Sequence, residues 1–260
     1  MLQNNNTISF VIVNYNSKKE LHRCLTDLSK INDAQNFEII IINNDKKSLT
    51  LPQYKFAKQS VYEINKNIGY GCASNIGLSH ANNRFVCFLN PDTHSFCNDL
   101  AKITTHLTHN KMIVAPQIRT QSNAVELWSV GEDITLLQTL KNNCGLNKKI
   151  WLTQNKISVD WVSGAAMIAS KKFLTELGGF DEDFFLYFED VDLCKRAINC
   201  GGKIQYIPQY FLTHINGASS GTNVQKQKKC YYTSQDLFFH KHYGASQKHF
   251  LRFCRLFQSK

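Results

Sequence analysis

The sequence lacks an apolar stretch long enough to cross a bilayer, since none of its windows approaches the about 18 apolar residues that a membrane span needs. The first residues also lack the basic leader and long apolar core of a signal peptide. The nine cysteines include no C-x-x-C pair and no metal-ligand spacing, which favours free thiols in a reducing compartment. We therefore expect a cytoplasmic chain whose contact with a membrane is peripheral.

Acidic residues are the scarcer charge, because 20 Asp and Glu residues stand against 30 Lys and Arg residues and leave a net charge of +10. The excess lies in residues 224–260, where eight basic side chains accompany a single acidic one, Asp236. A basic tail on a nearly neutral body indicates an anionic partner, either lipid head groups or nucleic acid. No nucleic-acid recognition module accompanies the tail, so we expect no nucleic-acid partner.

The end of this tail, residues 248–257, has the pattern of a basic amphipathic helix. Phe250, Phe253, Cys254 and Phe257 fall on one helical face, and basic residues lie across from them. Such a helix suits the inner surface of an anionic membrane, where each basic residue contributes up to about 1 kcal/mol. The alternative is that the aromatic face docks on the rest of the protein.

Two common nucleotide-binding motifs are also missing. Gly69 and Gly71 form a G-x-G pair before an expected helix at residues 75–81, and such glycines let the backbone approach a ligand closely. The third glycine is misplaced for a dinucleotide fingerprint, however, and the pair follows the third expected strand rather than the first. No Gly-Lys-Ser/Thr P-loop occurs. These absences weaken a dehydrogenase or NTPase interpretation.

The chain does contain apolar segments that alternate with helical patterns, which predicts an α/β fold with a mostly parallel sheet. The expected strands are residues 8–13, 37–42, 60–64 and 84–89. Polar clusters follow all four, at residues 14–16, 43–45, 65–67 and 90–92. In parallel sheets ligands bind at the carboxyl ends of the strands, so the clusters predict a polar-ligand site there. Each cluster taken alone is better explained as an ordinary turn, and it is the four together that favour a site.

Asp92 follows Pro91, which stops strand pairing and fixes the turn. A carboxylate held rigidly at the sheet edge suits Mg²⁺ or Mn²⁺, which takes one or two protein carboxylates and completes its shell with diphosphate oxygens. The alternative is that Asp92 caps the following helix.

The densest acidic stretch is residues 180–196, in which carboxylates alternate with aromatic and aliphatic side chains. Desolvation by such neighbours raises a carboxylate pKa towards the range useful for a general base. Glu189, Asp190 and Asp192 fall in the first turn of an expected helix, where negative charge meets the positive end of the dipole. A helix cap beside an aromatic cluster explains the same pattern, and the two interpretations stay open at this point.

The middle of the chain, residues 117–156, is polar and irregular and resembles an inserted loop or lid. An apolar strand is expected at residues 160–169, where Trp161 and small residues such as Gly164 could form a shallow saccharide-binding floor or simply pack tightly. A further strand at residues 203–207 is expected to end at Pro208. His214 follows it, and a lone histidine is more often structural than a ligand.

Taken together, these segments resemble the family 2 inverting glycosyltransferases of the GT-A fold, in the rhamnosyltransferase-like branch that builds bacterial surface polysaccharides. The matching segments are VIVNYN (11–16), IINN (41–44), NxGYGxxxNxG (67–77), FLNPD (88–92), GAAM (164–167) and GFDExxFxxFEDVDL (179–193). The resemblance implies a single Rossmann-like, mostly parallel central sheet flanked by helices, followed by the basic helical segment. It implies a catalytic domain at residues 1–223, with a nucleotide-binding half to about 116 and an acceptor-binding half after it, and an extension at 224–260.

The resemblance also implies roles for individual residues. Asp190 matches the catalytic base, and Asp92 with His214 matches the site of a divalent metal, Mg²⁺ or Mn²⁺. The implied donor-binding residues are Asn14, Tyr15, Asn43, Asn67, Gly69, Asn75, Asn90 and Asp92. The implied acceptor-binding residues are Trp161, Gly164, Glu189 and Asp192. Two positions depart from the pattern, because relatives commonly have an aspartate where Asn90 or Asn43 stands.

The implied reaction transfers a sugar, with L-rhamnose from dTDP-rhamnose as the first expectation, to a saccharide or a polyprenyl-diphosphate-linked acceptor in O-antigen or capsule synthesis. A UDP-sugar donor is the alternative, because the neutral Asn43 leaves the nucleobase open. A non-catalytic nucleotide-sugar or polysaccharide-binding module of the same fold is the rival from another class. We expect the basic tail to hold the enzyme on the inner face of the cytoplasmic membrane.

Overall fold

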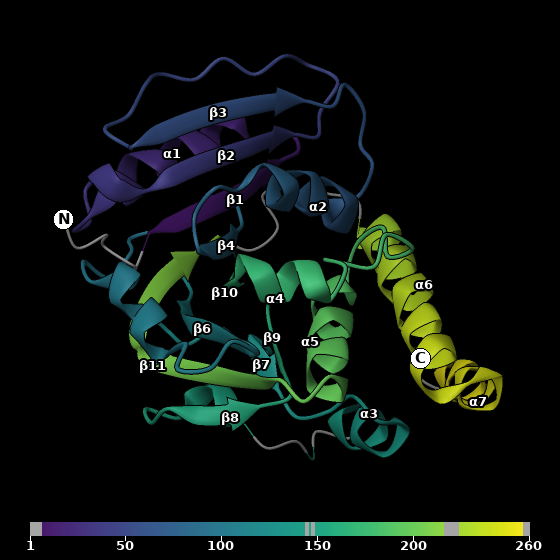
Figure 1. Ribbon diagram of the computed structural model, residues 1–260. Helices are drawn as coiled ribbons and strands as arrows, with labels where there is room; N and C mark the ends of the chain where they lie inside the picture. The colour runs from purple at the N-terminus through teal and green to yellow at the C-terminus, as the bar shows by residue number, and fades with distance from the viewer. Residues whose placement is uncertain (1–6, 144–145, 147–148, 216–223, 257–260) are drawn as a thin grey trace.

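The computed structural model describes residues 7–143, 146, 149–215 and 224–256. Within them, a nine-stranded sheet runs in the order β3-β2-β1-β4-β10-β6-β11-β5, with β8 paired to β11 (Figure 1). Its parallel N-terminal part consists of β1 (Ile8–Asn14), β2 (Glu38–Asn43), β3 (Lys58–Glu63) and β4 (Phe85–Leu89). The expected α/β class with a mostly parallel sheet is confirmed.

The second half of the sheet mixes strand directions. β6 (Met112–Arg119) and β11 (Lys203–His214) are parallel to each other, and β10 (Ala166–Ser170) lies antiparallel between β4 and β6. Two short strands, β5 (Thr93–His94) and β8 (Ile157–Val159), pair antiparallel with β11. A separate two-stranded sheet joins β7 (Val130–Gly131) to β9 (Trp161–Val162). β9 therefore projects from the main sheet toward the site described below.

Two apolar cores cover the two faces of the sheet, which explains why its central strands are apolar without alternation. Even-numbered residues of β1 such as Phe10 and Ile12 pack with α1 (Lys18–Leu28) and with the 3₁₀ turns η1 (Ala34–Asn36) and η2 (Leu100–His106). Odd-numbered residues such as Val11 face α2 (Tyr70–His80), α4 (Lys171–Glu176) and α5 (Glu189–Asn199). The remaining elements of this half are α3 (Leu136–Asn143) and η3 (Ile150–Leu152).

A third apolar cluster joins the C-terminal helices to the loop that precedes α5. Phe238 and Phe239 of α6 (Val224–Tyr243) and Leu251 of α7 (Ala245–Arg255) pack with Phe184 and Phe188. The helix α6 thus lies beside α5 in Figure 1. The predicted boundary at residue 223 lies outside the described residues, and among the described helices none is both long and apolar enough to span a bilayer.

Two local expectations were wrong. Pro208 does not end its strand: β11 continues to His214 across a register shift between Ile207 and Phe211, so the proline occupies an irregularity in the pairing. The strand expected at residues 160–169 is two strands, β9 and β10, separated by a turn.

The alternative in which the C-terminal helix docks through its aromatic face is wrong. Leu251 is the buried residue of α7, while Phe250 and Phe253 are 48% and 57% exposed. Phe257 lies outside the described residues. The helix therefore docks on the protein, but not through the predicted aromatic face.

Candidate active site

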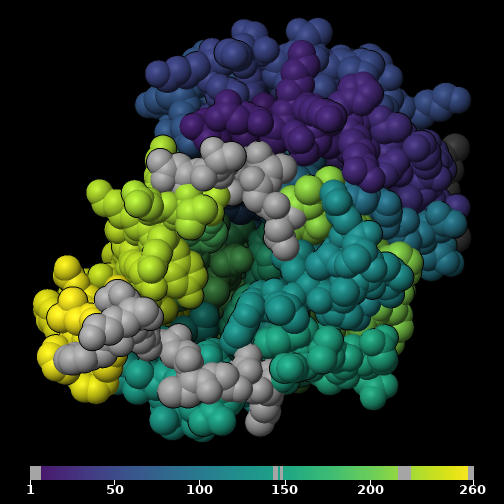
Figure 2. All heavy atoms as spheres, turned by 180° about the vertical axis from the view of Figure 1, so that it is seen from behind, coloured from purple at the N-terminus to yellow at the C-terminus, as the bar shows by residue number. Residues whose placement is uncertain are grey.

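A cavity of about 1300 Å³ opens at the carboxyl ends of the parallel strands. Figure 2 shows the molecule hollowed there, between the purple and blue N-terminal half, the teal segment after β6 and the yellow-green α6. Ten of the residues predicted to form the site line this cavity. They are Tyr15, Asn67, Gly69, Asn90, Asp92, Trp161, Gly164, Glu189, Asp190 and His214.

At one side of the cavity, His214 lies between two carboxylates. Its Nε2 is 3.0 Å from Asp92 Oδ1, and its Nδ1 is 3.0 Å from Glu126 Oε2. The three groups are brought together because His214 ends β11 and pairs with Thr93, directly after Asp92. Burial alone would lower the pKa of His214, but its contacts with Asp92 and Glu126 outweigh burial and raise it to about 10.

These residues fit a divalent cation that takes few protein ligands. Asp92 offers a buried carboxylate, and the Nε2 of His214 faces it, while Glu126 accepts from the other ring nitrogen. A metal-ligating histidine commonly has such a carboxylate behind it, which fixes the ring and its tautomer. The described residues contain no group of three or more His, Cys, Asp or Glu side chains placed for a metal. Ligand oxygens would therefore have to complete the shell, as is usual for Mg²⁺.

Across the site, Asp190 lies in the first turn of α5. Its Oδ2 accepts a hydrogen bond of 2.8 Å from the Gly164 amide, and its Oδ1 accepts one of 2.8 Å from the Val191 amide. Burial raises the pKa of Asp190, and the two amide donors oppose that rise. The carboxylate is thus held in one orientation at the cavity wall by the turn between β9 and β10.

Glu189, its neighbour, is more strongly desolvated. Its side chain is buried, and its Oε2 has no hydrogen-bond partner among the described residues. Burial, and next the charge of Asp190, raise the pKa of Glu189 to about 8. Two desolvated carboxyl groups side by side disfavour a double negative charge, and a single negative charge on the pair is the state that a general base needs.

The backbone before this pair is unusual. Tyr187 and Phe188 have φ angles of 69° and 68°, a left-handed conformation that bulky residues rarely adopt. Packing holds them there, since the Phe188 ring lies 5.5 Å from that of Phe238 on α6, and Ser234 of α6 donates to the Leu186 carbonyl. Strained backbone of this kind clusters at active sites. The helix α6 therefore helps to place the Glu189–Asp190 pair.

Two predicted donor-binding residues have their amides engaged inside the protein. Asn14 Nδ2 donates to Asn43 Oδ1 at 2.7 Å, and Asn43 Nδ2 donates to Glu63 Oε2 at 2.6 Å and to the Lys47 carbonyl at 2.8 Å. Neither residue lines the cavity. The reason is that β1 and β2 are adjacent and pair Asn14 with Asn43, so the two amides bond each other rather than a ligand.

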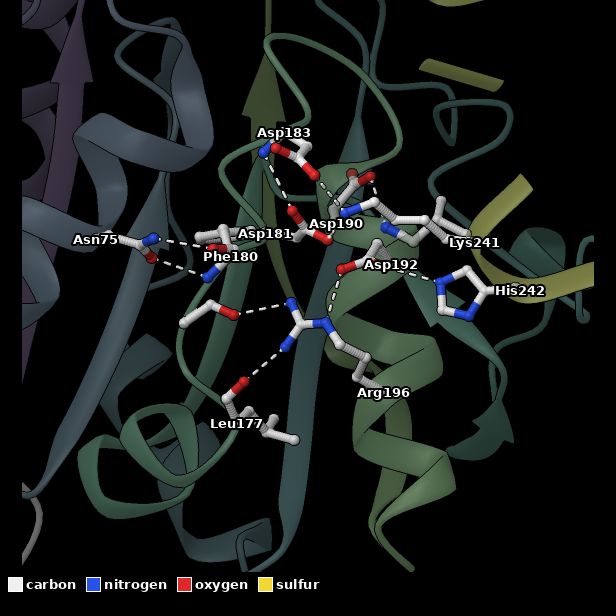
Figure 3. A network of polar contacts seen from close by, with 12 residues as sticks. Asn75, Leu177, Phe180, Asp181, Asp183, Asp190, Asp192, Arg196, Lys241 and His242 are labelled. Atoms are coloured by element: carbon white, nitrogen blue, oxygen red, sulfur yellow. Dashed lines mark hydrogen bonds and ion pairs between the residues drawn. The ribbon is translucent and has the colours of Figure 1, made fainter. Parts of the chain in front are cut away.

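Asn75 and Asp192 also lie away from the cavity, and Figure 3 shows what they bind instead. Asn75 holds the loop after α4, since its side chain bonds both the amide and the carbonyl of Phe180. Asp192 is buried between Arg196, at 2.7 Å, and His242 of α6, at 2.8 Å. The structure thus places both in the frame around the site, and not on the surface predicted to touch substrates.

Sequence reasoning missed three wall residues. Glu126 lies in the segment interpreted as a lid, and no spacing marked it as the partner of His214. Asn44 lines the cavity where Asn43 does not, and its Nδ2 donates to the Gly69 carbonyl at 3.2 Å. Tyr231 of α6 lines it too, although the tail was assigned to membrane binding. Only Asn44 had a signal, as a member of a polar cluster at a strand end.

Comparison with known proteins identifies the family. The model of Glycosyl transferase family 2 matches residues 9–173. The chain is 26% identical over 198 residues to a low-salt glycan biosynthesis hexosyltransferase, Agl10, of Haloferax volcanii, covering 73% of this chain and 61% of the relative. It is 24% identical to rhamnosyltransferase WbbL of Escherichia coli, covering 80% and 83%, and 25% identical to dTDP-rhamnosyl transferase RfbF of Shigella flexneri, covering 83% and 71%.

Solved structures agree on the fold. GalNAc-T7, crystallised with UDP, GalNAc and Mn²⁺, superimposes with a TM-score of 0.65 at 15% identity, covering 89% of this chain and 47% of that one. The mannosyltransferase PcManGT from Pyrobaculum calidifontis, with GDP-Man and Mn²⁺, gives 0.59 at 13% identity, covering 90% and 63%. The chain thus spans less than two thirds of Agl10 and of both solved structures. It belongs to glycosyl transferase family 2 and is a rhamnosyltransferase-like member with the GT-A fold.

Proposed function

We propose that this protein transfers a sugar from a nucleoside-diphosphate donor to an acceptor hydroxyl with inversion at the anomeric carbon. One observation carries the proposal: Asp190, held by two backbone amides, lines the same cavity as the Asp92–His214 pair. The cavity therefore offers a base and a candidate cation site to one bound substrate pair. Family membership supports the same reaction class.

Asp190 acts as the general base in this reaction. It takes the proton from the acceptor hydroxyl while that oxygen forms a bond to the anomeric carbon. The bond from that carbon to the diphosphate oxygen breaks, and the electron pair leaves with the diphosphate. General bases of this kind contribute about 10²–10⁴-fold in rate. The amides of Gly164 and Val191 keep the carboxylate aimed at one position.

Asp92 and His214 would hold Mg²⁺ or Mn²⁺, with Glu126 orienting the imidazole. When bound, the cation offsets the negative charge that grows on the diphosphate. Asn90, whose Nδ2 is 3.4 Å from His214 Nε2, stands where a second acid would add charge to the site. Its neutral amide keeps the residue beside the metal without binding it as a carboxylate would.

For the donor we propose dTDP-rhamnose, with a UDP-sugar as the alternative. The names of WbbL and RfbF support rhamnose, and RfbF supports the thymidine nucleotide. The nucleotide would lie along Tyr15, Asn44, Asn67 and Gly69, which line the cavity at the ends of the parallel strands. The acceptor we propose is a saccharide or polyprenyl-diphosphate-linked saccharide of a bacterial surface polysaccharide such as O-antigen or capsule.

We propose further that the enzyme acts at the inner face of the cytoplasmic membrane. The support lies in α7, where Phe250, at 48% exposure, and Leu256, at 72%, stand among basic residues such as Arg252. Apolar and basic side chains together favour an anionic bilayer surface. Sedimentation with anionic and neutral vesicles tests this location, and equal binding to both would reject the electrostatic part.

A thermal-shift screen of dTDP-rhamnose and several UDP-sugars, with and without Mn²⁺, tests the donor. A ligand present at 100 times its dissociation constant should add about 2.7 kcal/mol of stability. We expect the largest shift with dTDP-rhamnose and Mn²⁺ together. Release of the free sugar from the stabilising nucleotide sugar then tests catalysis. Stabilisation without any turnover would instead favour the non-catalytic binding module.

A further inference from the structure

The cavity is larger than one substrate of the proposed reaction requires. Pockets for single small ligands commonly measure about 300–1,000 Å³, whereas this one measures about 1300 Å³. The Asp92–His214 pair marks the end where a diphosphate would lie. Away from that pair, the cavity lies between α6 and the segment from Trp128 to Asn142, which form two sides of the hollow in Figure 2. That second end has the room for an acceptor.

Trp128 forms part of one wall in a conformation that tryptophan rarely adopts. Its φ is 60°, a left-handed value for which a bulky side chain costs about 1–3 kcal/mol. Its indole is nevertheless 46% exposed and lines the cavity, with its ring centroid 4.9 Å from that of the buried Trp151. The turn thus presents an aromatic face to the cavity instead of burying it. Glu126, two residues earlier, contacts His214, so the indole stands close along the chain to the candidate metal site.

Tyr231 forms part of the opposite wall, on α6. Its side chain is 42% exposed, and its ring centroid lies 5.3 Å from that of Phe188, the residue immediately before Glu189 and Asp190. Two contacts hold α6 against the loop before Glu189. Ser234 donates to the Leu186 carbonyl, and Phe238 is fully buried. The tyrosine ring is therefore held at a fixed place relative to the base.

The polar groups around these rings are mainly neutral amides. Gln138 and Asn142 of α3 bond each other, with Gln138 Nε2 donating to Asn142 Oδ1 at 3.0 Å, and Gln235 of α6 is also part of the wall. Among the described residues of this end, Lys226 is the one cationic side chain. A diphosphate is normally bound by several Arg or Lys donors. A pyranose fits better, since its C–H face packs on an aromatic ring and its hydroxyls bond amides.

We propose that Trp128 and Tyr231 form an aromatic subsite for a pyranose ring of the acceptor, so that the hydroxyl activated at Asp190 belongs to a sugar. This inference rests on the proposed glycosyl transfer and names the residues that bind the acceptor's sugar ring. The diphosphate and lipid of a lipid-linked acceptor then lie beyond this subsite, toward the rim of the cavity.

The test compares short alkyl diphosphates that carry one hexopyranose, in several configurations, with the same alkyl diphosphate without sugar. Calorimetry on the unmodified full chain should show about tenfold tighter binding for at least one sugar-bearing compound. Trp128→Ala and Tyr231→Ala should each weaken that compound about tenfold and raise its KM equally. Hydrolysis of the nucleotide sugar by water, without acceptor, should stay unchanged in both variants.

Leu127→Ala and Tyr232→Ala are the matched controls, since each lies next to a tested residue and neither lines the cavity. Both should bind like the unmodified chain. Equal binding of the sugar-free compound, or unchanged KM in the two aromatic variants, would overturn the subsite. Calorimetry needs no turnover, so its result stands apart from the proposed reaction. If the unmodified chain neither hydrolysed a nucleotide sugar nor transferred its sugar, the proposed reaction itself would be rejected.

Discussion

Two groups of polar side chains lie at the same edge of the sheet, yet they are used differently. Between β1 and β2, Asn14, Asn43 and Glu63 satisfy one another through hydrogen bonds of 2.6–2.7 Å, and they stay off the cavity. Around β4 and α5, Glu189 is buried and Asp190 is partly buried at the cavity wall, and burial raises both pKa values. The polar atoms of the first group bond one another, whereas the second group has polar atoms that a ligand could still contact.

The difference shows what identifies a site in this fold. Both groups lie toward the carboxyl ends of the strands, so this position does not separate a structural amide from a functional acid. Incomplete hydrogen bonding does separate them. A buried carboxylate with too few hydrogen-bond partners costs free energy unless a ligand or a proton supplies the missing partner. Glu189, with an unbonded Oε2, meets that criterion, and Asn43 does not. Each prediction below breaks one group and asks whether the loss appears in stability or in catalysis.

The largest effect is expected for Asp190→Asn. The neutral amide keeps a similar shape but cannot take a proton, so kcat should fall by about 10²–10⁴-fold. Donor affinity should stay within a few-fold, because Asp92 and His214 are untouched. Asparagine can accept from only one of the Gly164 and Val191 amides, so the free energy of unfolding should fall by about 1–3 kcal/mol. Transfer of radiolabelled sugar, donor calorimetry and thermal unfolding measure these three quantities.

Asp183→Asn is the control for that variant. Asp183 belongs to the same acidic stretch, but its side chain is 70% exposed and pairs with Lys241. Its loss should leave kcat near that of the unmodified enzyme. Normal turnover by Asp190→Asn would remove the base assignment.

Asn43→Asp should break the structural group with little direct effect on chemistry. It would place a carboxylate where the amide nitrogen now lies 2.6 Å from Glu63 Oε2, and it would leave the Lys47 carbonyl without its donor. We expect a loss of about 2–4 kcal/mol in the free energy of unfolding, measured with urea. The double variant Asn43→Asp with Glu63→Gln should recover most of it. Full stability of the single variant would show that Asn43 is not locked in this network.

Glu126→Gln tests the residue behind the candidate metal ligand. Glutamine still accepts from His214 Nδ1 but loses the charge that strengthens the imidazole as a ligand. Such changes behind a metal site weaken affinity about 10–100-fold. Titration of Mn²⁺ followed by its electron paramagnetic resonance signal reads this without any turnover. Glu132→Gln, on the same segment and also at the cavity wall, is the control and should bind Mn²⁺ normally. Identical Mn²⁺ affinity in Glu126→Gln would mean that His214 is not a ligand.

The sequence predicted the fold well, because it depends on local patterns. The apolar runs of β1, β2 and β4 and the short connections between them leave few topologies for the sheet. The carboxylates of α5 could also be predicted from local composition, since the many aromatic residues near Asp190 in the sequence indicate desolvation. Segments with no apolar pattern gave no such signal, and Glu126 could be placed beside His214 only by the pairing of β11 with its neighbours.

The remaining errors share a cause. Whether Asn43 faces a ligand or Asn14 depends on a cross-strand pair, and whether α6 covers the cavity depends on the aromatic contacts of Phe238 with Phe188. Both are contacts between residues far apart in the chain. The basic composition of the tail gave no sign that α6 contacts the loop before Asp190. Its four buried positions on α6, from Ser234 to Phe239, are what attach it to the catalytic loop.

The smallest effect concerns Glu189→Gln and should appear as a change in pH dependence. The pKa of Glu189 is about 8 in the fold and 4.5 as its ordinary value. Below pH 4.5 the side chain is protonated in both the folded and unfolded chains. Between 4.5 and 8 the unfolded chain loses the proton and the folded chain keeps it, so this group's contribution to stability falls as the pH rises.

The glutamine variant has no proton to lose, so its free energy of unfolding should decline less between pH 5 and 8 than that of the unmodified chain. Asp181→Asn should behave in the opposite sense. Burial opposes ionisation of Asp181, but Lys241 outweighs it and lowers the pKa, so its stabilising contribution is present at neutral pH and is lost in acid. Urea unfolding at several pH values separates the two variants. Parallel pH curves for Glu189→Gln and the unmodified chain would mean that Glu189 is ionised in the fold, and the distinction between satisfied and unsatisfied groups would then fail at its clearest example.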